Sequence, residues 1–108
     1  MGIVKSAERP LVHMMDGVHR RTMVWGDRML LAEILLDSGG EVPTHDHPYE
    51  QLGYCLSGRF DLVIDGVSET IERGMSWVIA AGLPHGATAH EPSFLIEIWS
   101  PARDDYKD

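Results

Sequence analysis

The sequence predicts an all-β protein, built as a double-sheet sandwich or a closed barrel, and two observations support this class. Short apolar runs separated by Gly, Pro and Asp turns recur through the 108 residues, a pattern typical of such folds. No segment longer than about eight residues carries the 3.6-residue apolar period of an amphipathic helix. The length suits a single compact domain over residues 1–108 and is too short for two.

The expected strands follow from short runs rich in β-branched and aromatic residues. They cover 18–25, 29–37, 41–44, 51–57, 60–64, 67–71, 77–80, 87–90 and 94–99. Asp65-Gly66 separates two alternating runs and predicts a two-residue hairpin turn. Gly-rich and Pro-containing turns at 38–40 and 82–84 punctuate the rest. The polar tail at 101–108 is expected to be peripheral.

Charge and cysteine content limit the partners and the compartment. Nine Lys and Arg residues against 17 Asp and Glu give a net charge of −8, which opposes binding to nucleic acids and to anionic membranes. A local Arg or a metal can still hold an anionic small molecule. Cys55 is the only cysteine, so no intrachain disulfide can form. With no apolar run of membrane-spanning length and no secretory signal, we expect a cytoplasmic protein.

His45 and His47 are candidate metal ligands. Residues i and i+2 of an extended strand point to the same side, and two imidazoles on one face suit Zn, Fe, Ni, Mn or Co. Asp46 lies between them and points away. Surface or core histidines produce the same short pattern, so the pair alone leaves that alternative open.

The surroundings of the pair resemble the two motifs of the cupin superfamily, G-x5-H-x-H-x3-E-x6-G and G-x5-P-x-G-x2-H-x3-N. The matching positions are Gly39, His45, His47, Gly58, Gly74, Gly82 and His85. The departures are Gln51 for the usual Glu, Ala80 for the usual Pro and Ala89 for the usual Asn. The motif core therefore spans residues 39–89.

This resemblance implies a single-domain, RmlC-like cupin, with a β-barrel or double-sheet jelly roll around one divalent transition metal. The implied metal ligands are His45, His47, Gln51 and His85. A neutral amide at Gln51 leaves the site one negative charge short, which favours an anionic substrate. The alternative is the same fold with no metal and with its histidines buried and hydrogen-bonded.

The last expected strand adds polar groups that suit chemistry. Leu95, Glu97 and Trp99 share one face by alternation. If that face lines the interior, Glu97 is a carboxylate near the metal, and it could act as a general acid or base. Trp99 could stack on a sugar ring, and Arg103 could form a bidentate pair with a substrate carboxylate. The reversed assignment leaves Glu97 in solvent.

The C-terminal run "FLIEIWSPARDDY" is similar to the pectin-degradation cupins of the KdgF type, whose members commonly end in D-x-F-S-P-x-R. That family converts cyclic 4,5-unsaturated uronates into linear ketones. The matching positions are Glu97, Trp99 and Arg103, with Glu for Asp and Trp for Phe. The resemblance implies a metal-dependent ring-opening enzyme for a small sugar acid, in which Glu97 and Arg103 are catalytic and Trp99 and Arg103 bind substrate.

Two other functions stay open: an Fe(II)-dependent cupin oxygenase, and a non-catalytic cupin that binds or senses a small molecule. Ring opening tolerates redox-inert Zn, whereas oxygenation does not. A strand before the motif core offers an edge for pairing between copies, so we expect a homodimer. Cys55 shares the face of Gln51 and is expected to be a small buried apolar side chain rather than a nucleophile.

Overall fold

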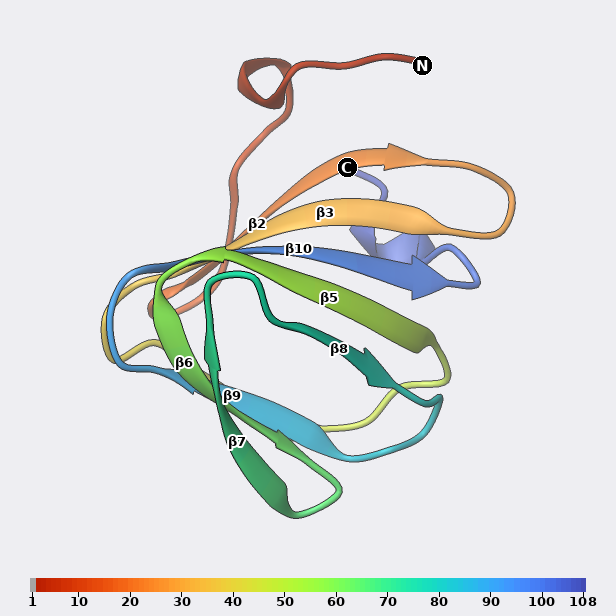
Figure 1. The fold of residues 1–108 in the computed structure, drawn as a ribbon. Helices are drawn as coiled ribbons and strands as arrows, with labels where there is room; N and C mark the ends of the chain where they lie inside the picture. The colour runs from red at the N-terminus through yellow and green to blue at the C-terminus, as the bar shows by residue number, and fades with distance from the viewer. Residues whose placement is uncertain (1) are drawn as a thin grey trace.

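The computed structural model describes residues 2–108 and folds them into two antiparallel sheets that face each other (Figure 1). The strands are β1 (Val12–Met15), β2 (Val18–Trp25), β3 (Leu30–Leu36), β4 (Glu41–His45), β5 (Glu50–Ser57), β6 (Arg59–Ile64), β7 (Val67–Glu72), β8 (Ser76–Ile79), β9 (His85–Ala89) and β10 (Ser93–Ser100). One sheet has the order β1-β2-β3-β10-β5-β8 and the other β4-β9-β6-β7. The prediction of an all-β, double-sheet jelly roll is confirmed. Over residues 2–108 no hydrogen-bonded strand pair joins the sheets into a closed barrel.

All nine predicted strands are present, with small differences at their ends, and the sequence missed one. The missed strand is β1, whose four residues Val-His-Met-Met have little β-branched character. The main difference in bounds is at β9, which begins at His85 rather than at residue 87. His85 thereby pairs with His45, the last residue of β4. Two 3-10 helices, Ser6–Glu8 and Asp104–Tyr106, complete the fold, and neither has the length or apolar character needed to cross a bilayer.

The predicted Asp65-Gly66 turn is confirmed. Both residues have positive φ, 49° and 80°, as a two-residue hairpin of the I′ type requires. Ile64 pairs with Val67 directly beside the turn. This turn fixes the register of β6 against β7.

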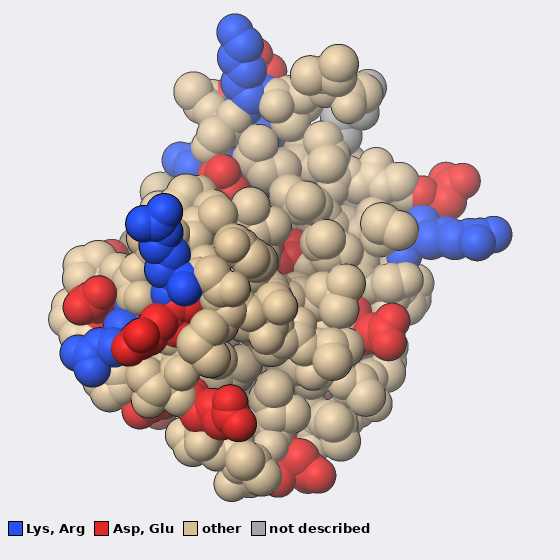
Figure 2. All heavy atoms as spheres, viewed as in Figure 1, with Lys and Arg blue, Asp and Glu red and all other residues tan. Residues whose placement is uncertain are grey.

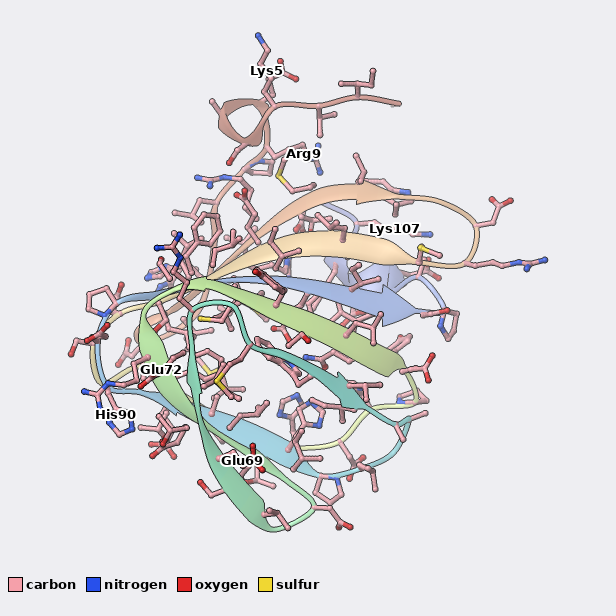
Figure 3. All side chains as sticks on the ribbon, viewed as in Figure 1. Lys5, Arg9, Glu69, Glu72, His90 and Lys107 are labelled. Carbon is pink, nitrogen blue, oxygen red and sulfur yellow. The ribbon has the colours of Figure 1, made fainter. Side chains whose placement is uncertain are left out.

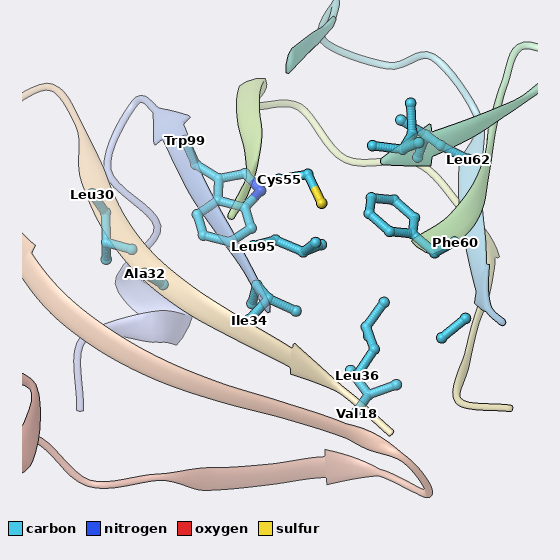
Figure 4. Packing of buried hydrophobic residues seen from close by; sticks show 12 residues of the cluster. Val18, Leu30, Ala32, Ile34, Leu36, Cys55, Phe60, Leu62, Leu95 and Trp99 are labelled. Atoms are coloured by element: carbon cyan, nitrogen blue, oxygen red, sulfur yellow. The ribbon is translucent and has the colours of Figure 1, made fainter. Parts of the chain in front are cut away.

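The core lies between the sheets, where alternate residues of each strand point inward. On β3 the buried positions alternate strictly with half-buried ones. Figure 4 shows Leu95 and Leu36 from the six-stranded sheet facing Phe60 and Leu62 from the other. Leu95, Glu97 and Trp99 are all buried. The face of β10 that they share therefore points into the interior, and the reversed assignment is wrong.

Gly53 makes room for an aromatic side chain on the inner face of the six-stranded sheet. It pairs with Trp77 on one side and with Glu97 on the other, and a Cβ added at Gly53 would overlap the Trp77 indole. We expect Gly53→Ala to lower the free energy of unfolding by about 1–3 kcal/mol, because overpacking forces the neighbouring side chains to shift. Urea unfolding measures the change. Gly26→Ala is the control, since a Cβ there meets nothing within 4 Å; equal effects of the two substitutions would contradict the prediction.

Candidate metal centre

Three histidines converge at one end of the space between the sheets. His45 ends β4, His47 follows in the connection to β5, and His85 begins β9. One ring nitrogen from each lies within 4.8 Å of the others. The sequence argument for His45 and His47 as neighbours on one extended strand is wrong in detail, because β4 ends at His45. The pairing of His45 with His85 across the sheet, together with the bend after β4, brings the rings together.

The backbone fixes the tautomer of each ring. The Nδ1 atoms of His45, His47 and His85 donate to the carbonyl oxygens of Pro43, Tyr49 and Leu83 at 2.9, 3.1 and 2.9 Å. A carbonyl only accepts hydrogen bonds, so the proton lies on Nδ1 and the lone pair on Nε2. The Nε2 atom of His85 is buried and has no hydrogen-bond partner among residues 2–108, and burial lowers the pKa of that ring. A neutral imidazole with a free Nε2 is the form that binds a metal.

Gln51 presents an oxygen to the same point. Its Nε2 donates to the Glu97 carboxylate, and its Oε1 accepts from the Trp99 indole at 3.0 Å. These two contacts orient the amide, with its oxygen 2.9 Å from Nε2 of His47. With the His47 proton on Nδ1, both of these atoms present lone pairs to the same point, as two ligands of one metal ion would.

The donor set therefore fits a divalent transition metal. Three imidazole nitrogens and one amide oxygen suit Zn, Ni, Mn, Fe or Co alike, so the identity of the metal stays open. All four donors are neutral, and a bound ion would keep its full charge toward the cavity. The orphaned Nε2 of His85 and the close approach of Gln51 to His47 are the observations that support this fit.

Glu97 lies on β10 beside this centre, with only 9% of its surface exposed. Small residues, Ala32 and Gly53, flank it on the neighbouring strands. Burial raises the pKa of Glu97 to about 7, against the opposing effects of Gln51, Trp77 and Arg103. A carboxyl group with this pKa exchanges its proton readily near neutral pH.

The stability of the metal-free protein should depend on the ionisation of Glu97. Its pKa is raised from 4.5 in the unfolded chain to about 7, so its contribution to stability is complete below about pH 4.5 and is lost as the pH rises through about 7. We expect wild type to lose up to about 3 kcal/mol of unfolding free energy more than Glu97→Gln between these limits. Urea unfolding of both proteins in chelator, at pH 4.5 and pH 8, measures the difference. The same pH dependence in both would contradict the assignment.

Arg103 follows β10, lines the same space as Glu97, and lies over aromatic rings. Its guanidinium carbon is 3.7 Å from the centre of the Tyr106 ring and 4.9 Å from that of Tyr49. Its Nε and Nη2 donate to the two carboxylate oxygens of Asp105 at 3.2 and 2.8 Å. The Arg103 guanidinium, which the sequence predicts to bind a substrate carboxylate, is therefore paired with the carboxylate of Asp105. This hydrogen-bonded pairing lowers the pKa of Asp105.

The C-terminal tail contributes to the site, although the sequence suggests a peripheral role. Tyr106 packs edge-on against Trp99, with ring centres 5.1 Å apart, and its ring also lies 4.0 Å from the guanidinium carbon of Arg20. Trp99 itself is 3% exposed, so its ring is largely committed to these contacts and to Gln51. Sequence reasoning missed Tyr106 and Trp77, because no motif or spacing marks either one.

A cavity of about 350 Å³ connects these groups. His45, Gln51, His85, Glu97, Trp99, Arg103 and Tyr106 line its polar part. The cavity brings together six of the seven residues that the sequence singles out. The seventh, His47, does not line the cavity but contacts Gln51.

The remaining histidines and the cysteine lie elsewhere. His90 pairs with Asp61 at 2.9 Å, and Figure 3 shows it at the rim of the molecule. His19 pairs with Asp37 at 3.2 Å, close to the ring of His13. Cys55 is fully buried in the core, and burial raises the pKa of its thiol, so it is a packing residue rather than a nucleophile.

Comparisons with known proteins agree with this geometry. The model of the cupin domain matches residues 32–99. The chain is 28% identical over 101 residues to the pectin degradation protein KdgF of Dickeya dadantii (strain 3937), covering 92% of each chain. Two solved structures are similar. KdgF from Halomonas sp. gives a TM-score of 0.88 at 27% identity over 94% of both chains. An RmlC-like cupin from Shewanella frigidimarina NCIMB 400 gives 0.94 at 25% identity, over 98% of this chain and 96% of that one.

The family match covers more than half of the chain, and the fold and the histidine cluster agree with it. This chain therefore belongs to the cupin domain family.

Proposed function

We propose that this chain opens the ring of a 4,5-unsaturated uronate and converts it to the linear keto form. The observation that carries the proposal is the buried carboxyl of Glu97. It accepts a hydrogen bond from Gln51, a candidate metal ligand, and it lines the same cavity as Arg103. The similarity to two proteins named KdgF, one of them named for pectin degradation, supports a sugar acid as substrate.

The proposed reaction is an isomerisation, so its atoms and electrons balance without a redox partner. A divalent metal held by His45, His47, Gln51 and His85 would supply Lewis acidity. Arg103 binds the carboxylate of the uronate, which replaces the Asp105 carboxylate as the partner of the guanidinium.

Glu97 then takes the proton from the hemiacetal hydroxyl. The C1–O5 bond breaks, its electron pair moves to the ring oxygen, and the open chain carries an aldehyde at C1 and an enolate at C5. Glu97 returns the proton to C4, and a ketone forms at C5. The two proton transfers at one buried carboxyl need a group that is both acid and base near neutral pH, which the raised pKa of Glu97 provides.

The test follows the ultraviolet absorbance of 4,5-unsaturated galacturonate, because the conjugated enol ether absorbs and the linear ketone does not. Zn-loaded protein should remove the absorbance faster than the spontaneous rate, and chelated protein should not. Turnover that requires both iron and O2 would instead identify an oxygenase. Saturable binding without turnover would identify a binding or sensing protein.

We also propose that two copies pack through the outer face of β10, β5 and β8. Leu52, Tyr54 and Val78 point outward there and are 47%, 46% and 60% exposed, beside Ile96 and Ile98. In the view of Figure 2 most Lys, Arg, Asp and Glu side chains lie toward the edges of the molecule, and uncharged residues cover much of the middle, where one acidic group also shows. Because each copy carries a net charge of −8, an uncharged face is where two copies meet with least repulsion.

We expect Tyr54→Lys to weaken this dimer at least about 100-fold, because each interface would bury two unpaired charges. Sedimentation velocity over a range of protein concentrations measures the dissociation constant. Val67→Lys is the matched control, since Val67 is 65% exposed on β7 of the other sheet. A monomeric wild type, or a dimer unaffected by Tyr54→Lys, would contradict the proposal.

A further inference from the structure

The cavity continues beyond the candidate metal centre into an apolar compartment. The strand registers give the order of its walls. Trp99 and Gln51 face each other on β10 and β5, and Glu97 follows two residues back along β10. Leu95 then lies beside Ile34 of β3. The last row is Leu36 beside Val18 of β2. At about 3.3 Å per residue, the step from the Glu97 row to the Leu36 row covers roughly 13 Å.

A β-bulge in β1 adds two more apolar side chains to this compartment. The pairing of β1 with β2 shifts between His13 and Met15, so that Met15 pairs with the inward-facing Val18. In a regular strand Met14 and Met15 would point to opposite faces. Because of the bulge, both line the cavity. Bulges next to ligand sites commonly redirect side chains in this way, and methionine adapts to ligands of varied shape.

The charged groups that line the cavity are confined to its other part. Among residues 2–108, its only charged lining residues besides the histidines are Glu97 and Arg103. The two parts of the cavity together have a volume of about 350 Å³, which is in the range of small-molecule sites and far above the voids that imperfect packing leaves in native cores. A hydroxylated ring placed against Leu36 and Met15 would lose its hydrogen bonds to water without replacement, which is costly. The compartment therefore suits hydrocarbon.

We infer that the cavity holds a second, apolar subsite, which binds the hydrocarbon part of a carboxylic acid whose carboxylate is held at the Arg103 end. The class of ligand is an acid with an unsubstituted six-membered ring or a short aliphatic chain. The inference rests on the proposed function only in taking Arg103 as the carboxylate partner, and it does not require ring opening. A uronate fills the polar part alone, and an amphipathic acid fills both parts.

The test compares two carboxylates that each carry a six-membered ring, by isothermal titration of the full chain, with and without Zn. One is 3-cyclohexylpropanoate and the other is galacturonate. We expect the hydrocarbon acid to bind at least about tenfold more tightly, with the negative heat-capacity change that marks apolar burial. Equal affinities, or tighter binding of galacturonate, would overturn the inference.

Variants locate the subsite. Met15→Gln keeps the length of the side chain and should weaken 3-cyclohexylpropanoate about fivefold or more. Met29→Gln is the matched control, because Met29 is 55% exposed outside the cavity, and it should change the affinity less than twofold. If circular dichroism shows that Met15→Gln does not fold, Met14→Gln takes its place. Equal effects of the cavity variant and the control would overturn the inference.

The two proposals can fail separately. If 3-cyclohexylpropanoate binds as expected but the absorbance of unsaturated galacturonate is unaffected, the subsite stands and ring opening fails. If the uronate is converted but the hydrocarbon acid does not bind preferentially, ring opening stands and the apolar compartment is only part of the core.

Discussion

Glu97→Gln is expected to slow ring opening about 10²- to 10⁴-fold, the range that a positioned acid–base group contributes, while metal content stays unchanged. The substitution keeps an oxygen that can accept from the Gln51 amide, so the orientation of Gln51 is preserved. It removes the proton exchange near neutral pH that burial confers on Glu97. The absorbance assay gives the rate, and metal analysis after gel filtration gives the occupancy.

The pH profile separates catalysis by Glu97 from a structural role. The first proton transfer needs the ionised carboxylate, so the wild-type rate should rise with pH through the pKa of Glu97. Burial raises this pKa to about 7 in the metal-free protein, and a bound divalent cation would lower it, so the rise should lie at or below about pH 7. The residual rate of Glu97→Gln should lack this rise. If the variant instead lost its metal, or kept the wild-type profile at a lower rate, Glu97 would be a residue that positions Gln51 rather than a catalytic one.

His85→Ala is expected to lower metal affinity by more than about 100-fold, since losing even a hydrogen-bond partner of a ligand costs about 10- to 100-fold. Activity should fall with occupancy. The fold should survive, because Nε2 of His85 makes no hydrogen bond within the part of the chain that the structure describes, and the Nδ1 bond is local, to Leu83. Competition with a chromogenic chelator measures the affinity, and thermal unfolding of the metal-free protein checks the fold.

His90→Ala is the matched control for this substitution. His90 begins the turn after β9 and pairs with Asp61 on the surface, so its loss should leave the metal affinity within about twofold, as expected of surface groups outside a site. Metal retained at full affinity by His85→Ala would remove His85 from the ligand set. Equal losses in both variants would point to a general loss of structure.

Local pattern was sufficient for most of the fold. Alternation placed Leu95, Glu97 and Trp99 on one face of β10, and the Asp65-Gly66 pair predicted the hairpin, because both depend on residues close in sequence. The resemblance to the two cupin motifs implied the cluster of His45, His47 and His85. The histidines meet in the structure because β4 pairs with β9, and this pairing cannot be read from the motif itself.

The features that escaped the sequence depend on contacts between distant segments. Tyr106 reaches the cavity because the tail folds back over β10, and nothing near Tyr106 in sequence signals that path. The bulge in β1 depends on its pairing with β2 rather than on its own residues. The capture of Arg103 by Asp105 is local, but it is one of several pairings open to a polar tail.

The amide of Gln51 also bears on how this site can evolve. Its NH2 group faces the Glu97 carboxylate and its oxygen faces His47. The Glu that is usual at this place in the cupin motif would set two carboxylates against each other in a buried site, where like charges strongly disfavour ionisation of both. Positions 51 and 97 therefore constrain each other's substitutions. A lineage that acquires the usual carboxylate ligand must give up its buried acid, or acquire a compensating change, along the way.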